Sequence, residues 1–168
     1  MSSPPEIPPP DESAGAGGVA RDVDALAKLS VFGALTRETI AFLARRCQDV
    51  VTPKNGTFCH QGDAGDCLFV LRQGRVAVIR TVGKKSVVLA ELAAGECFGE
   101  MALLAISARN ATVRALEDCV ALRLRHHALL ELSQQDLEQF ALLQMNLARD
   151  VARRLAAADQ ALLDHLGR

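Results

Sequence analysis

The sequence predicts an α+β fold, in which a jelly-roll-like antiparallel β-roll of about eight strands is flanked by N-terminal helices and a C-terminal helix pair. Between residues 50 and 125, short β-branched or apolar runs alternate with glycine-containing turns, which is typical of an antiparallel sandwich or roll. On both sides of this segment apolar residues recur every three or four positions, as in helices. A chain of 168 residues, 49% of them apolar, is long enough to bury one core.

Residues 1–20 differ in composition from the rest of the chain. They hold five of the six prolines and three negative charges, with no Lys or Arg. This composition predicts a disordered tail, although a proline cluster can also dock in an aromatic groove. Residues 21–168 are then the folded domain, with a helical segment at 21–49, the β-roll at 50–125 and the C-terminal helices at 126–167.

In the first helical segment the apolar spacing is interrupted at Gly33. This predicts two short helices joined by a turn. Thr36 is expected to be the N-cap of the second helix. The following runs predict strands: Val50–Thr52, Thr57–His60, Cys67–Leu71, Val76–Ile79, Ser86–Leu89, Ala111–Val113 and Val120–Leu122.

After the roll we expect a short helix around Ala128–Leu132 and a long one from about Gln135 to Leu166, with Ser133 as its candidate cap. One apolar stripe runs along the long helix through Leu143, Leu147, Val151, Leu155, Ala158, Leu162 and Leu166. The stripe is longer than a small roll can cover. Its distal half is therefore expected to lie on its own domain, to cover a ligand or to pair with a second copy.

Composition excludes several classes of function. The five cysteines are widely spaced with no C-x-x-C pair, so we expect reduced, partly buried thiols in a cytoplasmic protein. The net charge of -1 gives no basic footprint for nucleic acid. The chain has no signal-peptide pattern and no apolar run that could span a membrane. The four histidines lack metal-site spacing and no nucleophile has an evident base, so neither an enzyme nor a cofactor is expected.

The segment from Phe98 to Val113 carries the candidate chemistry. Glu100 and Arg109 stand nine residues apart, separated by a small-residue turn and a short apolar stretch. A guanidinium gives forked donors to a phosphate, and a carboxylate accepts from a hydroxyl. Gly99 would let backbone N–H groups approach an anion. This combination suits a small anionic ligand that also carries hydroxyl groups.

The same segment resembles the phosphate-binding cassette of the cyclic nucleotide-binding domain, a family that includes kinase regulatory subunits, gated channels and catabolite activators. The two family motifs are matched without a gap by Phe98-Gly99-Glu100-Met101-Ala102-Leu103-Leu104 and Arg109-Asn110-Ala111-Thr112-Val113. The resemblance covers about residues 22 to 166. It implies that the chain is a sensing module for a cyclic nucleotide, and we expect cyclic AMP in preference to cyclic GMP.

The resemblance also implies roles for individual residues. Glu100 would accept from the ribose 2′-hydroxyl and Arg109 would bind the cyclic phosphate. Phe98, Gly99, Met101, Ala102 and Ala111 would complete the cassette around the phosphate, and Leu89, Leu103 and Val113 would be apolar neighbours of the ribose or base, or simply core. Because the chain has no Trp or Tyr, we expect a lid made from Arg149, Arg153 or Arg154 with Leu155, unless Phe140 covers the base.

Two positions depart from the family pattern. Ala108 precedes the phosphate arginine where many relatives have Pro, which leaves more backbone entropy to lose on binding. Asn110 follows it where a small apolar residue accompanies cyclic AMP and a hydroxyl accompanies cyclic GMP. Because Asn offers both a donor and an acceptor, the choice between the two bases stays open.

The resemblance further implies that ligand binding moves the C-terminal helix, which would signal to an effector protein or through a homodimer. Catabolite activators carry a helix-turn-helix after this helix, and the sequence up to Arg168 has no basic recognition segment. We therefore expect neither a DNA-binding nor a catalytic domain within the chain. The alternative is a ligand-free interaction domain that retains the roll.

Overall fold

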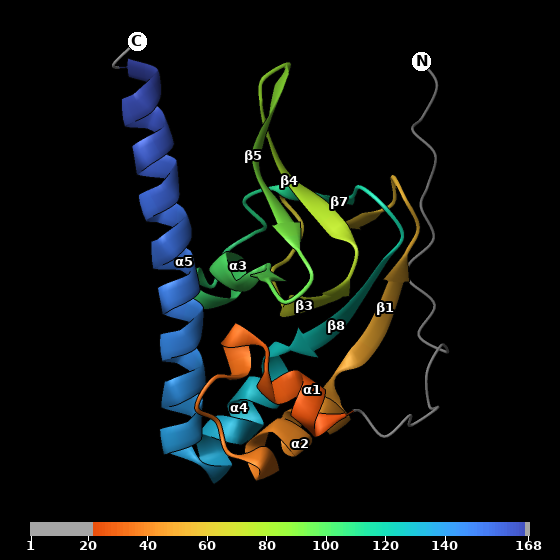
Figure 1. The fold of residues 1–168 in the computed structure, drawn as a ribbon, viewed down its shortest axis with the longest axis vertical. Coiled ribbons are helices and arrows are strands. Elements are labelled where there is room, and N and C mark those ends of the chain that lie inside the picture. Colours follow the sequence, from red (N-terminus) through yellow and green to blue (C-terminus); the bar gives the residue numbers. More distant parts are fainter. Residues whose placement is uncertain (1–21, 167–168) are drawn as a thin grey trace.

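Eight antiparallel strands form two four-stranded sheets in the computed structural model, which describes residues 22–166 (Figure 1). The strands are β1 (Gln48–Thr52), β2 (Thr57–Cys59), β3 (Cys67–Gln73), β4 (Arg75–Val82), β5 (Lys85–Ala93), β6 (Cys97–Phe98), β7 (Thr112–Ala115) and β8 (Cys119–Arg125). The sheet orders are β1-β8-β3-β6 and β2-β7-β4-β5. The predicted β-roll is confirmed, and the expected disordered tail at 1–20 lies outside the described residues.

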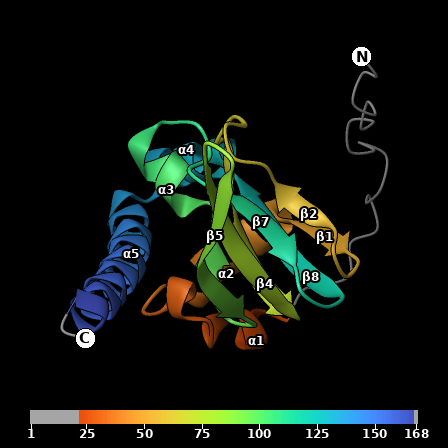
Figure 2. The same cartoon turned by 90° about the horizontal axis from the view of Figure 1, so that it is seen from above.

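The helices are α1 (Val23–Ala27), the 3-10 turn η1 (Ser30–Phe32), α2 (Arg37–Arg46), α3 (Glu100–Ala105), α4 (His126–Gln135) and α5 (Leu137–Leu166). The N-terminal helices, α4 and the start of α5 pack at the end of the roll where the chain enters and leaves, whereas α3 lies between the roll and α5 (Figure 1). Figure 1 shows that α5 and the β4–β5 hairpin both extend beyond the roll in one direction. Seen along that direction, the two stand apart (Figure 2).

Strand β3 shows how the roll separates two cores. Leu68 and Val70 pack with the helices, whereas Phe69 and Leu71 pack between the two sheets. This alternation follows from the two-residue period of a strand. The inner core includes Phe98, whose ring stacks on Phe69 with centroids 5.0 Å apart, so β6 delivers the start of the cassette to the centre of the roll.

The sequence predicted two helix N-caps, Thr36 and Ser133, and the structure confirms the first of them. Thr36 is the N-cap of α2, where its side chain accepts from the Thr39 N–H at 3.2 Å, as predicted. The prediction of Ser133 as the cap of the long helix is wrong, because Ser133 lies inside α4 and its hydroxyl donates to the Leu130 carbonyl. Asp136 takes this place instead, with its carboxylate accepting from the Gln139 N–H at 3.0 Å. Both residue types are good caps, so local sequence did not separate them.

The predicted apolar stripe of α5 is only partly buried. Leu143 and Leu147 are fully buried against the helices, whereas Leu155, Leu162 and Leu166 are 61%, 57% and 72% exposed. Beyond Leu147 the face of α5 turned toward the domain is polar and carries Asp150 and Arg154. The apolar stripe of α5 is therefore buried only in the first half of the helix, and the middle of the helix meets the domain through polar side chains.

Candidate ligand-binding site

Gly99 turns the chain from β6 into α3 and so places Glu100 at the start of that helix. Its φ is 82°, in the left-handed region that favours glycine. A Cβ at this position would lie 2.5 Å from Nη1 of Arg109. Gly99 is therefore needed both for the turn and for the close approach of the arginine.

Arg109 is buried and its guanidinium is held against the cassette backbone. Nη1 donates to the Gly99 carbonyl at 2.8 Å, and Nη2 donates to Sγ of Cys67 at 3.1 Å. Its backbone is also clamped, because Arg109 N–H donates to the Asp63 carbonyl and Gly62 N–H donates to the Arg109 carbonyl. The loop before β3 therefore also helps to position the arginine.

Glu100 and Arg109 line one small pocket of about 70 Å³. Within the described part of the chain, Oε2 of Glu100 and Nε of Arg109 are buried and have no hydrogen-bond partner. A buried polar atom without a partner carries a large desolvation penalty. The pocket thus offers a ligand two unpaired atoms: an acceptor on the Glu100 carboxylate and a donor on the Arg109 guanidinium.

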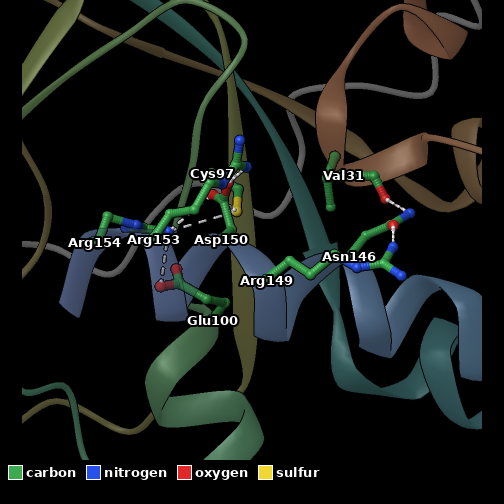
Figure 3. Close-up of polar contacts among 8 residues, drawn as sticks. All are labelled: Val31, Cys97, Glu100, Asn146, Arg149, Asp150, Arg153 and Arg154. Atoms are coloured by element: carbon green, nitrogen blue, oxygen red, sulfur yellow. Dashed lines mark hydrogen bonds and ion pairs between the residues drawn. The ribbon is translucent and has the colours of Figure 1, made fainter. Parts of the chain in front are cut away.

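Arg154 of α5 lines this pocket, and Figure 3 shows it beside Glu100 and Asp150. Its Nη2 lies 3.0 Å from Oε1 of Glu100 and 3.1 Å from Oδ2 of Asp150. Asp150 also accepts from Sγ of Cys97 at 3.3 Å. Through these contacts α5 is joined to both β6 and α3 beside the pocket.

Burial raises the pKa of Glu100 above the ordinary value of 4.5, and the Arg154 guanidinium offsets part of this rise. Burial likewise raises the pKa of Cys67 to about 11 and that of Cys97 well above its usual range. The Cys67 and Cys97 thiols therefore act as neutral neighbours of Arg109 and Asp150. All five cysteines are buried.

Most of the sequence-predicted site residues meet at this pocket. Its lining includes Phe98, Gly99, Glu100, Met101, Ala102, Arg109, Asn110, Ala111, Val113 and Arg154. Two lining residues, Cys59 and Val78, were not anticipated. They come from β2 and β4, and strand alternation alone does not say which inward residues reach a pocket.

The structure places the other candidates elsewhere. Leu89 and Leu155 are more than half exposed, and Leu103 packs in the helical core. Arg153 is exposed and pairs with Asp150, and Arg149 donates to Asn146. Phe140 lines a separate hollow between α3, α4 and α5.

Among the residues that the structure describes, no group of three or more His, Cys, Asp or Glu side chains could hold a metal ion. Within the same residues no helix is both long and apolar enough to cross a membrane.

Comparison with known proteins places the roll and the cassette in one family. Residues 50–136 match the family model of the cyclic nucleotide-binding domain. The cyclic AMP receptor protein of Thermus thermophilus is 35% identical over 130 residues, which are 77% of this chain and 58% of that protein. The chain thus spans less than two thirds of this relative.

Solved structures give the same result. The Thermus thermophilus catabolite activator protein is 34% identical, with a TM-score of 0.69 over 82% of this chain and 63% of that one. A cyclic nucleotide-binding domain from Methylobacillus flagellatus has a TM-score of 0.76 over 85% of this chain and 81% of that one. At 23% identity the second match supports the fold alone.

Proposed function

Because the chain belongs to the cyclic nucleotide-binding domain family, we propose that it binds a cyclic nucleotide in the pocket between α3, β4 and Arg154. One observation carries the proposal: Glu100 and Arg109 are buried in the same pocket, and each keeps one polar atom without a partner among the described residues. A cyclic nucleotide has one phosphate charge and one free ribose 2′-hydroxyl. These two groups match the unpaired donor and the unpaired acceptor.

In this proposal Arg109 donates to the cyclic phosphate, whose negative charge compensates the buried guanidinium. Oε2 of Glu100 accepts from the 2′-hydroxyl, because its other oxygen already faces Arg154. Phe98, Val78 and Val113 supply apolar walls. In both polar contacts, a buried atom that has no partner gains a charge-assisted hydrogen bond.

A matched pair of ligands tests the role of Glu100. Wild type and Glu100→Gln are titrated with cyclic AMP and with its 2′-deoxy analogue. Losing a hydrogen bond to a charged group should cost wild type about tenfold or more in affinity, while the variant should discriminate much less. Equal discrimination by both proteins would assign the 2′-hydroxyl to another residue.

We infer that cyclic AMP is the preferred ligand over cyclic GMP. The relative from Thermus thermophilus is named a cyclic AMP receptor protein, whereas Asn110, which lines the pocket, offers both a donor and an acceptor and does not itself choose between the bases. Competition between the two nucleotides measures the preference. A lower dissociation constant for cyclic GMP would overturn it, and Asn110→Thr should shift the ratio toward cyclic GMP.

We further propose that α5 reports occupancy. Arg154 contacts the carboxylate that the ribose would use, so nucleotide and helix share one acceptor group. A ligand moves such an equilibrium only by binding one arrangement better than the other. Hydrogen exchange along α5 should therefore change around Arg154 when nucleotide is added, and unchanged exchange at saturation would contradict this output.

The exposed face of α5 favours a second copy of the chain as the partner. Exposed residues follow an alternating spacing of four and three positions, through Ala141, Met145, Ala148, Ala152, Leu155, Asp159, Leu162 and Leu166. That spacing is the heptad seam of a coiled coil. The alanines of this row lie in the first part of α5, and the leucines lie in its distal part. If the chain remains a monomer in solution, the proposal of a second copy is wrong and an effector protein becomes the expected partner of this face.

A further inference from the structure

The link between η1 and α2 contains a strained turn over Phe32–Leu35. Leu35 N–H donates to the Phe32 carbonyl at 3.2 Å, with Gly33 at φ -55° and ψ 135° and Ala34 at φ 62°. These values define a type II turn, whose third residue is usually Gly or Asn. Ala34 occupies that position although its Cβ makes the left-handed region unfavourable.

Asn146 of α5 binds the Gly33 carbonyl of this turn and the Val31 carbonyl just before it. Its Nδ2 donates to Gly33 O at 2.7 Å and to Val31 O at 3.2 Å. Its Oδ1 accepts from Nη1 of Arg149 at 3.2 Å, which fixes the direction of the amide (Figure 3). The contact thus depends on the orientation of the Gly33–Ala34 peptide.

A type II turn becomes a type I turn by rotation of its central peptide. The change involves mainly ψ of the second residue and φ of the third, while the ends of the turn stay in place. In the type I form the Gly33 carbonyl would point to the opposite face, away from Asn146. Ala34 would then adopt a negative φ and lose its strain.

Asn146 lies on the same face of α5 as the residues beside the ligand pocket. Asp150 and Arg154 follow it at intervals of four positions, and both contact the cassette side of the domain (Figure 3). One helix face therefore holds the pocket at one point and the N-terminal turn at another. A movement of α5 at Arg154 would also act on the contact of Asn146.

We propose that the Gly33–Ala34 peptide is a two-position element, which Asn146 holds in its strained position and which flips when α5 moves away. The N-terminal helices thereby sense the position of α5. The proposal rests on the proposed function only for the cause of the movement, because the hold itself exists without nucleotide.

A double-mutant cycle without nucleotide tests the hold. In the wild-type background Ala34→Gly should raise the urea midpoint, because it relieves the left-handed strain at an exposed position. Asn146→Asp keeps the size of the side chain but removes the amide donors, so the turn should relax and Ala34 should adopt a negative φ. In that background Ala34→Gly should lower the urea midpoint, because glycine increases the conformational entropy of the unfolded chain. Asn146→Ala provides a second background if the Asp variant folds poorly.

Asn55 offers the matched control. It also has a positive φ, 68°, but lies in the turn between β1 and β2. Asn55→Gly should change the midpoint equally in both Asn146 backgrounds. A shift of the same sign and size for Ala34→Gly in both backgrounds would overturn the proposal.

Nuclear magnetic resonance separates this hold from nucleotide binding. Ala34 should show the strong intraresidue HN–Hα cross-peak of a positive φ in wild type, and lose it in Asn146→Asp. Saturating cyclic AMP should weaken the same cross-peak in wild type. An unchanged cross-peak despite measured binding heat would overturn the transmission, whereas absence of binding heat would count against the proposed function and leave the result of the cycle intact.

Discussion

Glu100 is a carboxylate in surroundings that disfavour its charge. Its side chain is 2% exposed, and Nη2 of Arg154 lies 3.0 Å from its Oε1. Burial raises its pKa more than the cation lowers it. Its carboxylate can therefore accept from a ligand hydroxyl, but burying the charge lowers the free energy of unfolding.

We predict that Glu100→Gln flattens the pH dependence of stability. The folded pKa lies above the ordinary value of 4.5, so the folded state binds the proton more tightly than the unfolded state. Relative to the variant, wild type should therefore lose free energy of unfolding as the pH rises from about 4.5 through the folded pKa. Urea unfolding between about pH 5 and pH 8 measures the difference.

Glu91 provides the control, because it is an exposed glutamate paired with Arg75 on the surface of the roll. Glu91→Gln should not reproduce the effect. A wild-type stability that rises relative to Glu100→Gln over this range would show that the buried carboxylate is stabilising, contrary to its raised pKa.

At the residue scale the sequence predicted much of the site because charged and glycine positions carry local information. Glu100, Arg109 and Gly99 were identified from their chemistry and spacing, and all three lie at the pocket. The partners Cys67 and Asp63 were not identified, because they reach Arg109 through long-range packing. Leu89 was expected near the ligand but is exposed on β5, since apolarity alone does not distinguish the two faces of a hairpin.

Helix α5 is the element that joins the site to the rest of the molecule. Its first half packs on the core through Leu143 and Leu147, its middle meets the pocket through Arg154, and its last part is exposed. The three- and four-residue spacing was visible in the sequence. The division of that spacing between a buried and an exposed face was not, because it depends on where the roll ends.

Two leucines on α5 test this division. Leu147 is fully buried and Leu155 is 61% exposed. Leu147→Ala should lower the free energy of unfolding by about 2–5 kcal/mol through the loss of core packing, whereas Leu155→Ala should change it by less than about 0.5 kcal/mol. Chemical unfolding at a protein concentration low enough to favour monomers compares them. Similar losses in both variants would mean that the distal half also packs on its own domain.

At the scale of the whole molecule, the roll is a scaffold that brings the cassette and α5 together at one edge. The fold class followed from the regular runs and glycine turns of residues 50–125. Strand β6 was not among the predicted runs, because two residues are too few to show alternation. It was the pairing of β6 with β3 that placed Glu100 in the interior.

We predict that the chain self-associates through the exposed seam of α5. Replacing Leu155 and Leu162 together by Glu places charges in the apolar layers of the seam and should shift the sedimentation coefficient toward that of a monomer. Val51→Glu is the control, since Val51 is 74% exposed on β1, on the other side of the roll (Figure 1). Equal loss of association in the control, or a wild type that sediments as a monomer at all concentrations, would contradict the seam.

Titration calorimetry of wild type and Arg109→Leu with cyclic AMP and cyclic GMP tests the central claim most directly. Arg114→Leu is the control, because Arg114 lies on the exposed face of β7. We predict a binding heat for wild type and the control, and an affinity at least about 30-fold weaker for Arg109→Leu, since the variant loses a buried charge pair with the phosphate. No heat for wild type with either nucleotide, or equal affinity in Arg109→Leu, would contradict the account and favour a ligand-free interaction domain.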